Sequence, residues 1–187
     1  MAKNGKTEKK LECLFMLSPM SDRYIDLILG SLAALDVSAL ASQTGRMGTF
    51  YCGRAEAVLD AVCACFAGAW DPEVHMTLEA MFTVPEEVPA ETEGTADIPW
   101  KNLTRLAGRQ FVLNSRFRLF RRSEAGSRQR TEALVKGSSL VRGEAFRYTE
   151  LTGTVHEIAA FYAELAEALE PGDAIQVTFS VNSPTAE

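Results

Sequence analysis

The hydrophobic pattern of residues 11–83 predicts strand, helix, strand, strand, helix and strand, in that order. Residues 11–18 form a short apolar strand, and two further short strands separate the helices. The first helix has one apolar face, formed by Ile25, Ile28, Leu29 and Leu32. The second helix covers residues 53–69, and residues 75–83 alternate as a strand. This order is that of a split βαβ, or ferredoxin-like, unit.

A second stretch, residues 140–184, repeats much of this pattern about one hundred residues later. Gly153 opens a helix as Gly53 does, and Thr154 with Glu157 forms a plausible capping box at its start. Residues 174–182 alternate as a closing strand. Internal repetition of this kind predicts a duplicated fold. We therefore expect an α+β protein of two tandem ferredoxin-like (βαββαβ) repeats, with antiparallel sheets that carry helices on one face.

The expected domains are a first repeat at residues 11–83, an acidic, proline-containing linker at 84–107 and a second repeat at 108–184. The second repeat has a divergent opening. Residues 108–120 can supply its first strand, but residues 121–136 are basic and irregular, so a helix there is only weakly indicated.

Charge is unevenly distributed in a chain whose net charge is −6. Residues 1–100 carry 7 of the 19 Lys and Arg residues, and the other 12 all precede Tyr148. Sheets that bind RNA usually present paired aromatic residues on their open face, whereas this one is expected to present Thr, Ser, Gln and Glu. We therefore expect no nucleic-acid partner. The role of the basic segment, residues 116–136, stays open between a solvated surface and a contact with the acidic linker.

The four cysteines, Cys13, Cys52, Cys63 and Cys65, lack the spacing of a metal knuckle or redox pair, and we expect buried, reduced thiols. The polar N-terminus and the short apolar run after it match neither a signal sequence nor a membrane span. The sequence thus predicts a cytoplasmic protein with no membrane insertion.

Four stretches together carry a family resemblance: LFMLSPMSDRYIDLILGSLAALDVS, the Gly53 helix, HMTLEAMFTV and FSVNSP. In their order and spacing, the chain resembles the YkoF family of tandem ferredoxin-like proteins that bind thiamin or its hydroxymethylpyrimidine moiety. The resemblance implies non-catalytic binding of such a ligand, linked to vitamin uptake or salvage. The chain departs from the family pattern at residues 114–136, which lack a Pro-Met turn, and this puts a second ligand pocket in doubt.

An aminopyrimidine needs hydrogen bonds and a stacking or thioether surface, and a cationic thiazolium favours a carboxylate or an aromatic face. The predicted ligand residues of the first repeat share one mixed sheet face or the adjoining turn: Ser18, Met20, Thr49, Tyr51, Glu79 and Met81. In the second repeat Thr149 corresponds to Thr49, while Leu151 replaces Tyr51. Asn182 and Ser183, in the FSVNSP stretch, complete the set.

Each of these residues also has a purely structural interpretation. Glu79 can be a solvated strand residue, and Tyr51 and Met81 can pack one sheet against another. Ser18 and Ser21 can serve as turn and capping residues. Asn182 and Ser183, which precede a proline, can simply form a turn.

No catalytic or metal-binding group is indicated, and no cofactor is expected. His75 and His156 are the two histidines, and neither is paired with a nucleophile. The glycines lack the spacing of a phosphate-binding loop, which favours an unphosphorylated ligand over a diphosphate. The alternative function is a regulatory or assembly module whose tandem sheets mainly form a homodimer, a state that we also expect for the binding protein. A pyrimidine-salvage enzyme would need a nucleophile and a base that the sequence does not offer.

Overall fold

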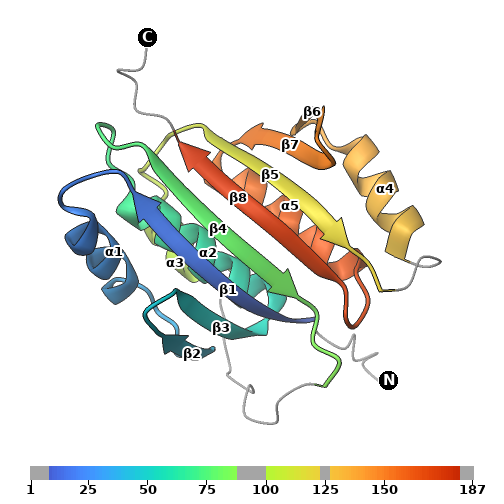
Figure 1. Cartoon of the computed structure of the whole chain (residues 1–187), viewed down its shortest axis with the longest axis horizontal. Helices are drawn as coiled ribbons and strands as arrows, with labels where there is room; N and C mark the ends of the chain where they lie inside the picture. The colour runs from blue at the N-terminus through green and yellow to red at the C-terminus, as the bar shows by residue number, and fades with distance from the viewer. Residues whose placement is uncertain (1–8, 88–99, 123–126, 182–187) are drawn as a thin grey trace, which may run out of the picture.

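The computed structural model describes residues 9–87, 100–122 and 127–181. It is a mixed α+β fold built on one antiparallel sheet of eight strands (Figure 1). The two longest helices of the described residues, α2 (Ala55–Ala69) and α5 (Val155–Ala168), lie behind the central strands in this view. The opposite face of the sheet, called the open face below, carries none of the helices of the described residues.

The first half follows the predicted order closely. Its remaining elements are β1 (Lys10–Pro19), α1 (Tyr24–Ala33), β2 (Ala41–Thr44), β3 (Thr49–Arg54) and β4 (Met76–Thr83). Ser21 does not cap α1, as its position had suggested. Its hydroxyl accepts a hydrogen bond from the Arg23 backbone N–H inside the turn, and the helix begins three residues after Ser21.

The second half has the same series of elements. They are β5 (Leu113–Phe120), α4 (Ser127–Gly137), β6 (Val141–Ala145) and β7 (Tyr148–Gly153), followed by α5 and β8 (Ala174–Val181). The predicted capping box is present: the Thr154 side chain accepts from the Glu157 N–H, and the Glu157 carboxylate accepts from the Thr154 N–H. The weakly indicated helix in the basic segment also exists, as α4.

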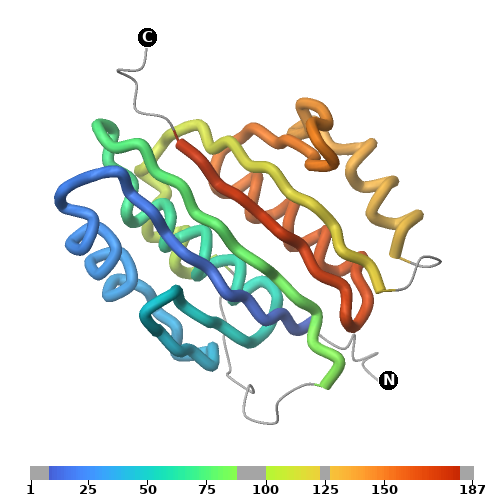
Figure 2. The backbone as a smooth tube through the Cα atoms, viewed as in Figure 1, coloured from blue at the N-terminus to red at the C-terminus, as the bar shows by residue number. Residues whose placement is uncertain are grey.

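The strands are arranged in the order β2-β3-β1-β4-β8-β5-β7-β6. We expected a separate sheet for each half, and this was wrong, because β4 and β8 pair along their whole length, from Met76 opposite Val181 to Thr83 opposite Ala174. Figure 2 shows these two strands side by side at the centre of the molecule. Two closing strands can satisfy each other's backbone groups, which joins the halves into one sheet.

Both halves contribute to one hydrophobic core between the sheet and the helices. The rings of Phe66 on α2 and Tyr162 on α5 both contact Phe179 of β8, at centroid distances of 5.8 and 6.0 Å. The Tyr162 hydroxyl shares a 2.7 Å hydrogen bond with the Ser115 hydroxyl, so this buried polar pair is satisfied. The core thus crosses the boundary between the halves.

A short helix that the sequence did not predict, α3 (Lys101–Arg105), lies within the segment expected to be a linker. The buried carboxylate of Asp60 on α2 accepts hydrogen bonds from the backbone N–H groups of Asn102 and Leu103 and from the Asn102 side chain, each at 2.9 Å. Since Leu103 is also fully buried, α3 is held firmly against α2.

All four cysteines are free and buried, as predicted. Burial raises the pKa of the Cys65 thiol from 9.0 to about 11. In residues 9–87, 100–122 and 127–181, every helix is too short or too polar to cross a lipid bilayer.

Candidate functional site

The strand register separates the predicted site residues onto two faces of the sheet. Thr49 lies opposite Phe15, and Tyr51 lies opposite Cys13, so both point toward the helices. Glu79 and Met81 instead lie opposite Met16 and Leu14, on the open face. The prediction that these four residues share a face was wrong. A difference of one residue in the assumed register of β3 reverses the direction of all its side chains.

A cavity of about 480 Å³, called the first cavity below, lies between β1, α1 and the β2–β3 hairpin. Its walls combine apolar helix residues, strand residues and the hairpin turn. The lining residues are Phe15, Met16, Leu17, Ser18, Pro19, Tyr24, Ile28, Leu29, Leu32, Thr44, Gly45, Arg46, Met47, Gly48, Thr49 and Cys65.

The hairpin closes on β1 because one of its residues is a glycine. A Cβ atom at Gly48 would lie 2.6 Å from the carbonyl oxygen of Phe15, so a side chain there would push the strands apart. The Gly45 N–H donates to the Gly48 carbonyl at 2.9 Å, and the hydroxyls of Thr44 and Thr49 lie 3.3 Å apart. The hairpin therefore holds the Thr49 hydroxyl in a defined place at the cavity.

Helix α1 supplies the apolar wall, and this wall is only partly covered by the rest of the protein. Ser31 is the one buried residue of α1, and its hydroxyl donates to the Cys65 carbonyl on α2. Leu29 remains 58% exposed and Tyr24 is half-exposed, although both line the cavity. A helix whose apolar face borders a cavity can gain burial when a ligand enters.

The first cavity is suited to a small neutral or aromatic molecule. Among the residues that the structure describes, Arg46 is the single charged residue that lines it, and no carboxylate does. Phe15 and Tyr24 offer aromatic surface, and the Thr49 hydroxyl can both donate and accept a hydrogen bond. The raised pKa of Cys65 keeps its thiol neutral at ordinary pH, so this sulfur is not an activated nucleophile.

Two of the predicted residues, Ser18 and Thr49, line the first cavity. Tyr51 does not line the cavity; it is buried, with its ring 5.3 Å from that of Phe15, so it packs in the core between sheet and helices and not against a second sheet. Met20 is exposed in the turn after β1 and does not line the cavity. Glu79 and Met81 occupy the open face. Asn182 and Ser183 lie outside the described residues.

Thr149 lies where the sequence repeat placed it, as the counterpart of Thr49. It is opposite Phe117 on β5, just as Thr49 is opposite Phe15 on β1, and it lines a separate cavity between β5 and α4. Ile28, Leu29 and Leu32 belong to the apolar helix face that the sequence pattern predicts, and no ligand role was predicted for them. Their regular spacing revealed the face, but only the fold shows that it borders a cavity.

Within the described ranges, no three His, Cys, Asp or Glu side chains gather in a way suited to a metal ion. His75 precedes β4, and His156 lies in the first turn of α5, on different elements of the fold.

Comparison with known proteins finds a family match in the first half of the chain. A family model described as the YKOF-related family matches residues 10–89, a range that spans β1 to β4 and therefore the whole first cavity. This match confirms the resemblance stated from the sequence. No curated protein matches the chain.

Proposed function

Residues 10–89 of this chain are YKOF-related, and from this premise we propose that the protein binds thiamin or its hydroxymethylpyrimidine moiety without catalysing a reaction. The ligand occupies the first cavity, and the protein serves vitamin uptake or salvage in the cytoplasm. The fold that carries this site is a pair of tandem ferredoxin-like repeats. The strand orders β2-β3-β1-β4 and β6-β7-β5-β8 support that description, since each half repeats the same arrangement.

One observation carries the proposal: the apolar face of α1 is left half-exposed beside a cavity of about 480 Å³. A volume of this size suits a small organic ligand. The pyrimidine ring lies against Phe15 and the α1 side chains, and the Thr49 hydroxyl hydrogen-bonds to its polar edge. Side chains that are partly solvated in the free protein lose contact with water when the ligand binds, which favours binding.

The charge of the cavity favours the pyrimidine end of the vitamin as the part that is enclosed. A cationic thiazolium gains little from walls whose single charged lining group is the guanidinium of Arg46. The thiazolium therefore remains at the mouth or reaches an aromatic face such as that of Tyr24. Free hydroxymethylpyrimidine should consequently bind at least as well as thiamin.

Thermal unfolding with thiamin, hydroxymethylpyrimidine and thiamin diphosphate tests the proposal. Ligand at one hundred times its dissociation constant should stabilise the fold by about 2.7 kcal/mol. Leu29→Ala should weaken binding about tenfold, because the ligand then buries less apolar surface. The matched control is Ile25→Ala on the same helix, since Ile25 is 53% exposed and does not line the cavity. If none of the three compounds stabilises the protein, the proposed function is refuted. If Leu29→Ala and Ile25→Ala weaken binding equally, the ligand does not bind in the first cavity.

A second candidate function, a homodimeric assembly module, is favoured by the open face. Leu14, Met16 and Met81 are exposed on adjacent strands there, and such apolar clusters often mark interfaces. Sedimentation of the ligand-free protein, together with Leu14→Glu, separates this function from the first, because Leu14 is exposed on the open face and does not line the first cavity. Assembly is favoured if the wild-type protein binds none of the three compounds and forms a dimer that Leu14→Glu disrupts.

A further inference from the structure

The second half contains a cavity of about 340 Å³, called the second cavity below, at the place equivalent to the first. It lies between β5, α4 and the β6–β7 hairpin, and Phe117 and Thr149 stand where Phe15 and Thr49 stand in the first half. The lining residues are Phe117, Arg118, Leu119, Arg121, Thr131, Glu132, Val135, Lys136, Glu144, Arg147 and Thr149. Six of these eleven are charged, in contrast to Arg46 alone in the first cavity.

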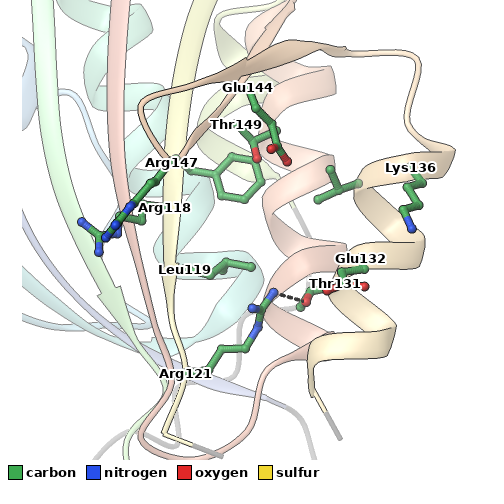
Figure 3. A pocket seen from close by; sticks show the side chains of 11 residues that line it. Arg118, Leu119, Arg121, Thr131, Glu132, Lys136, Glu144, Arg147 and Thr149 are labelled. Carbon is green, nitrogen blue, oxygen red and sulfur yellow. Dashed lines mark hydrogen bonds between the residues drawn. The ribbon is translucent and has the colours of Figure 1, made fainter. Parts of the chain in front are cut away.

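Figure 3 distinguishes the charged groups that border the enclosed space from those that point away. The side chains of Arg118 and Arg147 extend to the side of β5 that is remote from α4. Arg118 packs over the ring of Phe120, with its guanidinium carbon 4.9 Å from the ring centroid. Arg121 instead points into the space between β5 and α4, with Glu144 and Thr149 at the opposite end.

The guanidinium of Arg121 is fixed in place, and the charge of Glu132 attracts it without forming an ion pair. Its Nη2 donates to the hydroxyl of Thr131, which is fully buried, at 2.7 Å. Its Nε is buried and has no hydrogen-bond partner among the described residues. Within the same part of the chain, no carboxylate forms an ion pair with Arg121. A buried, unpaired N–H on a cation is costly unless an acceptor reaches it.

The nearby carboxylate of Glu132 is occupied by another cation. Arg128 Nε lies 2.8 Å from Glu132 Oε1, and this hydrogen bond is the main cause that lowers the pKa of Glu132. Lys136 is exposed on the next turn of α4 and also lines the cavity. Once Glu132 is paired with Arg128, the cavity retains Arg121 and Lys136 against Glu144, so its α4 end is positively charged.

We propose that the second cavity binds a small organic anion, a carboxylate or a phosphate monoester, through the guanidinium of Arg121. Arginine suits this role because its planar N–H groups match carboxylate and phosphate oxygens. Lys136 adds attraction at the mouth, and Phe117, Leu119 and Val135 contact the apolar body of the ligand. Glu144 and Thr149 accept a hydrogen bond from a donor at its other end. This inference does not depend on the proposed function, because the two cavities share no lining residue.

Titration calorimetry with phenyl phosphate, benzoate, inorganic phosphate and the neutral benzyl alcohol tests the inference on the full chain. At least one of the two aromatic anions should bind about tenfold more tightly than benzyl alcohol, and their ratio distinguishes a phosphate site from a carboxylate site. Failure of both aromatic anions to saturate the protein at millimolar concentration, or equal binding of benzyl alcohol, would overturn the proposal.

Variants locate the site. Arg121→Met should reduce anion affinity at least tenfold and Lys136→Met about threefold, and added salt should weaken the wild-type complex. Lys136 is exposed, so its substitution reports on binding even if Arg121→Met perturbs folding. Arg105 is an exposed charge on α3, so Arg105→Met is the control and should leave the anion affinity unchanged.

If the anion affinity is undiminished in both Lys136→Met and Arg121→Met, the anion binds outside the second cavity and the assignment is wrong. Leu29→Ala should leave anion binding intact, which separates this test from that of the first cavity.

Discussion

The two halves of the sheet have the same arrangement of elements, yet their equivalent cavities have opposite chemical character. In the first, apolar residues of α1 face a space with one charged group, Arg46. In the second, the basic helix α4 and Arg121 border a space with several charged groups. The sheet and core helices are determined by burial, whereas residues at the first helix and hairpin of each half vary without disturbing that burial. The two halves therefore share one arrangement of elements but differ in the chemistry of the residues that line their cavities.

The largest difference between the halves that mutation can test is the attachment of α3. Asp60 of α2 holds α3 through three hydrogen bonds, while the equivalent position of α5 is the exposed Ala160. Asp60→Ala should lower the free energy of unfolding by about 3 kcal/mol, because it leaves buried N–H groups without an acceptor. Urea denaturation measures this loss. The matched variant Ala160→Asp should leave the free energy of unfolding almost unchanged. If both variants lowered it by similar amounts, the hydrogen bonds from Asp60 to α3 would not be the cause of the loss.

A smaller effect concerns the thiols, all four of which lie in the first half. The folded-state pKa of Cys65 is raised from 9.0 to about 11, so the unfolded chain releases its proton first as pH rises. Stability should therefore fall above pH 9 by about 1.4 kcal/mol per pH unit for this group, until the folded-state pKa is reached. Cys65→Ala should reduce that slope, as measured by urea denaturation at pH 7.5 and pH 10.

The control for this pH effect is Leu165, the equivalent residue of α5, which is also fully buried. Leu165→Ala should cost the same stability at both pH values, since it removes apolar contacts and no titrating group. An unchanged alkaline slope in Cys65→Ala would show that the thiol does not contribute to it.

The smallest predicted effect distinguishes the starts of the two core helices. Helix α5 begins with the Thr154 and Glu157 capping box, whereas α2 begins after Arg54 with no side-chain cap. Thr154→Ala should destabilise the protein by about 1 kcal/mol, and Thr154→Ser should restore most of that loss because serine keeps the accepting oxygen. Thermal melts of both variants check this expectation. If serine fails to rescue the alanine variant, the hydroxyl is not the stabilising group.

Much of the fold could be predicted because it depends on periodicity. The alternation in residues 75–83 and 174–182 predicted the strands that became β4 and β8, and the capping box predicted the start of α5. Their pairing with each other could not be predicted. Two strands with this alternation can pair in one continuous sheet, or each can form the edge of a separate sheet. Helix α3 was missed because its five residues are too few to show a period, and its stability comes from Asp60, which is 42 residues away from Asn102 in sequence.

The candidate site was only partly predictable for a related reason. Ser18 and Thr49, which were predicted as ligand residues, line the first cavity, whereas Glu79, which was assigned to the same face as Thr49, lies on the open face. Sequence alternation tells which residues of one strand share a side, yet it does not fix the register between strands. The exposure of Leu29 depends on how α1 packs against the rest of the first half, and α1 is attached to α2 by the hydrogen bond from the Ser31 hydroxyl to the Cys65 carbonyl.

The two shortest strands, β2 and β6, form the edges of the sheet, and this affects which surfaces of two molecules can contact each other. The sheet ends in β2, four residues long and exposed at every position, and in β6, five residues long and irregular between Val141 and Gly143. Such short or bulged edges are poor templates for another strand, so they limit end-to-end growth into fibres. The broad surface of the sheet is therefore better suited than its edges to contacts between copies.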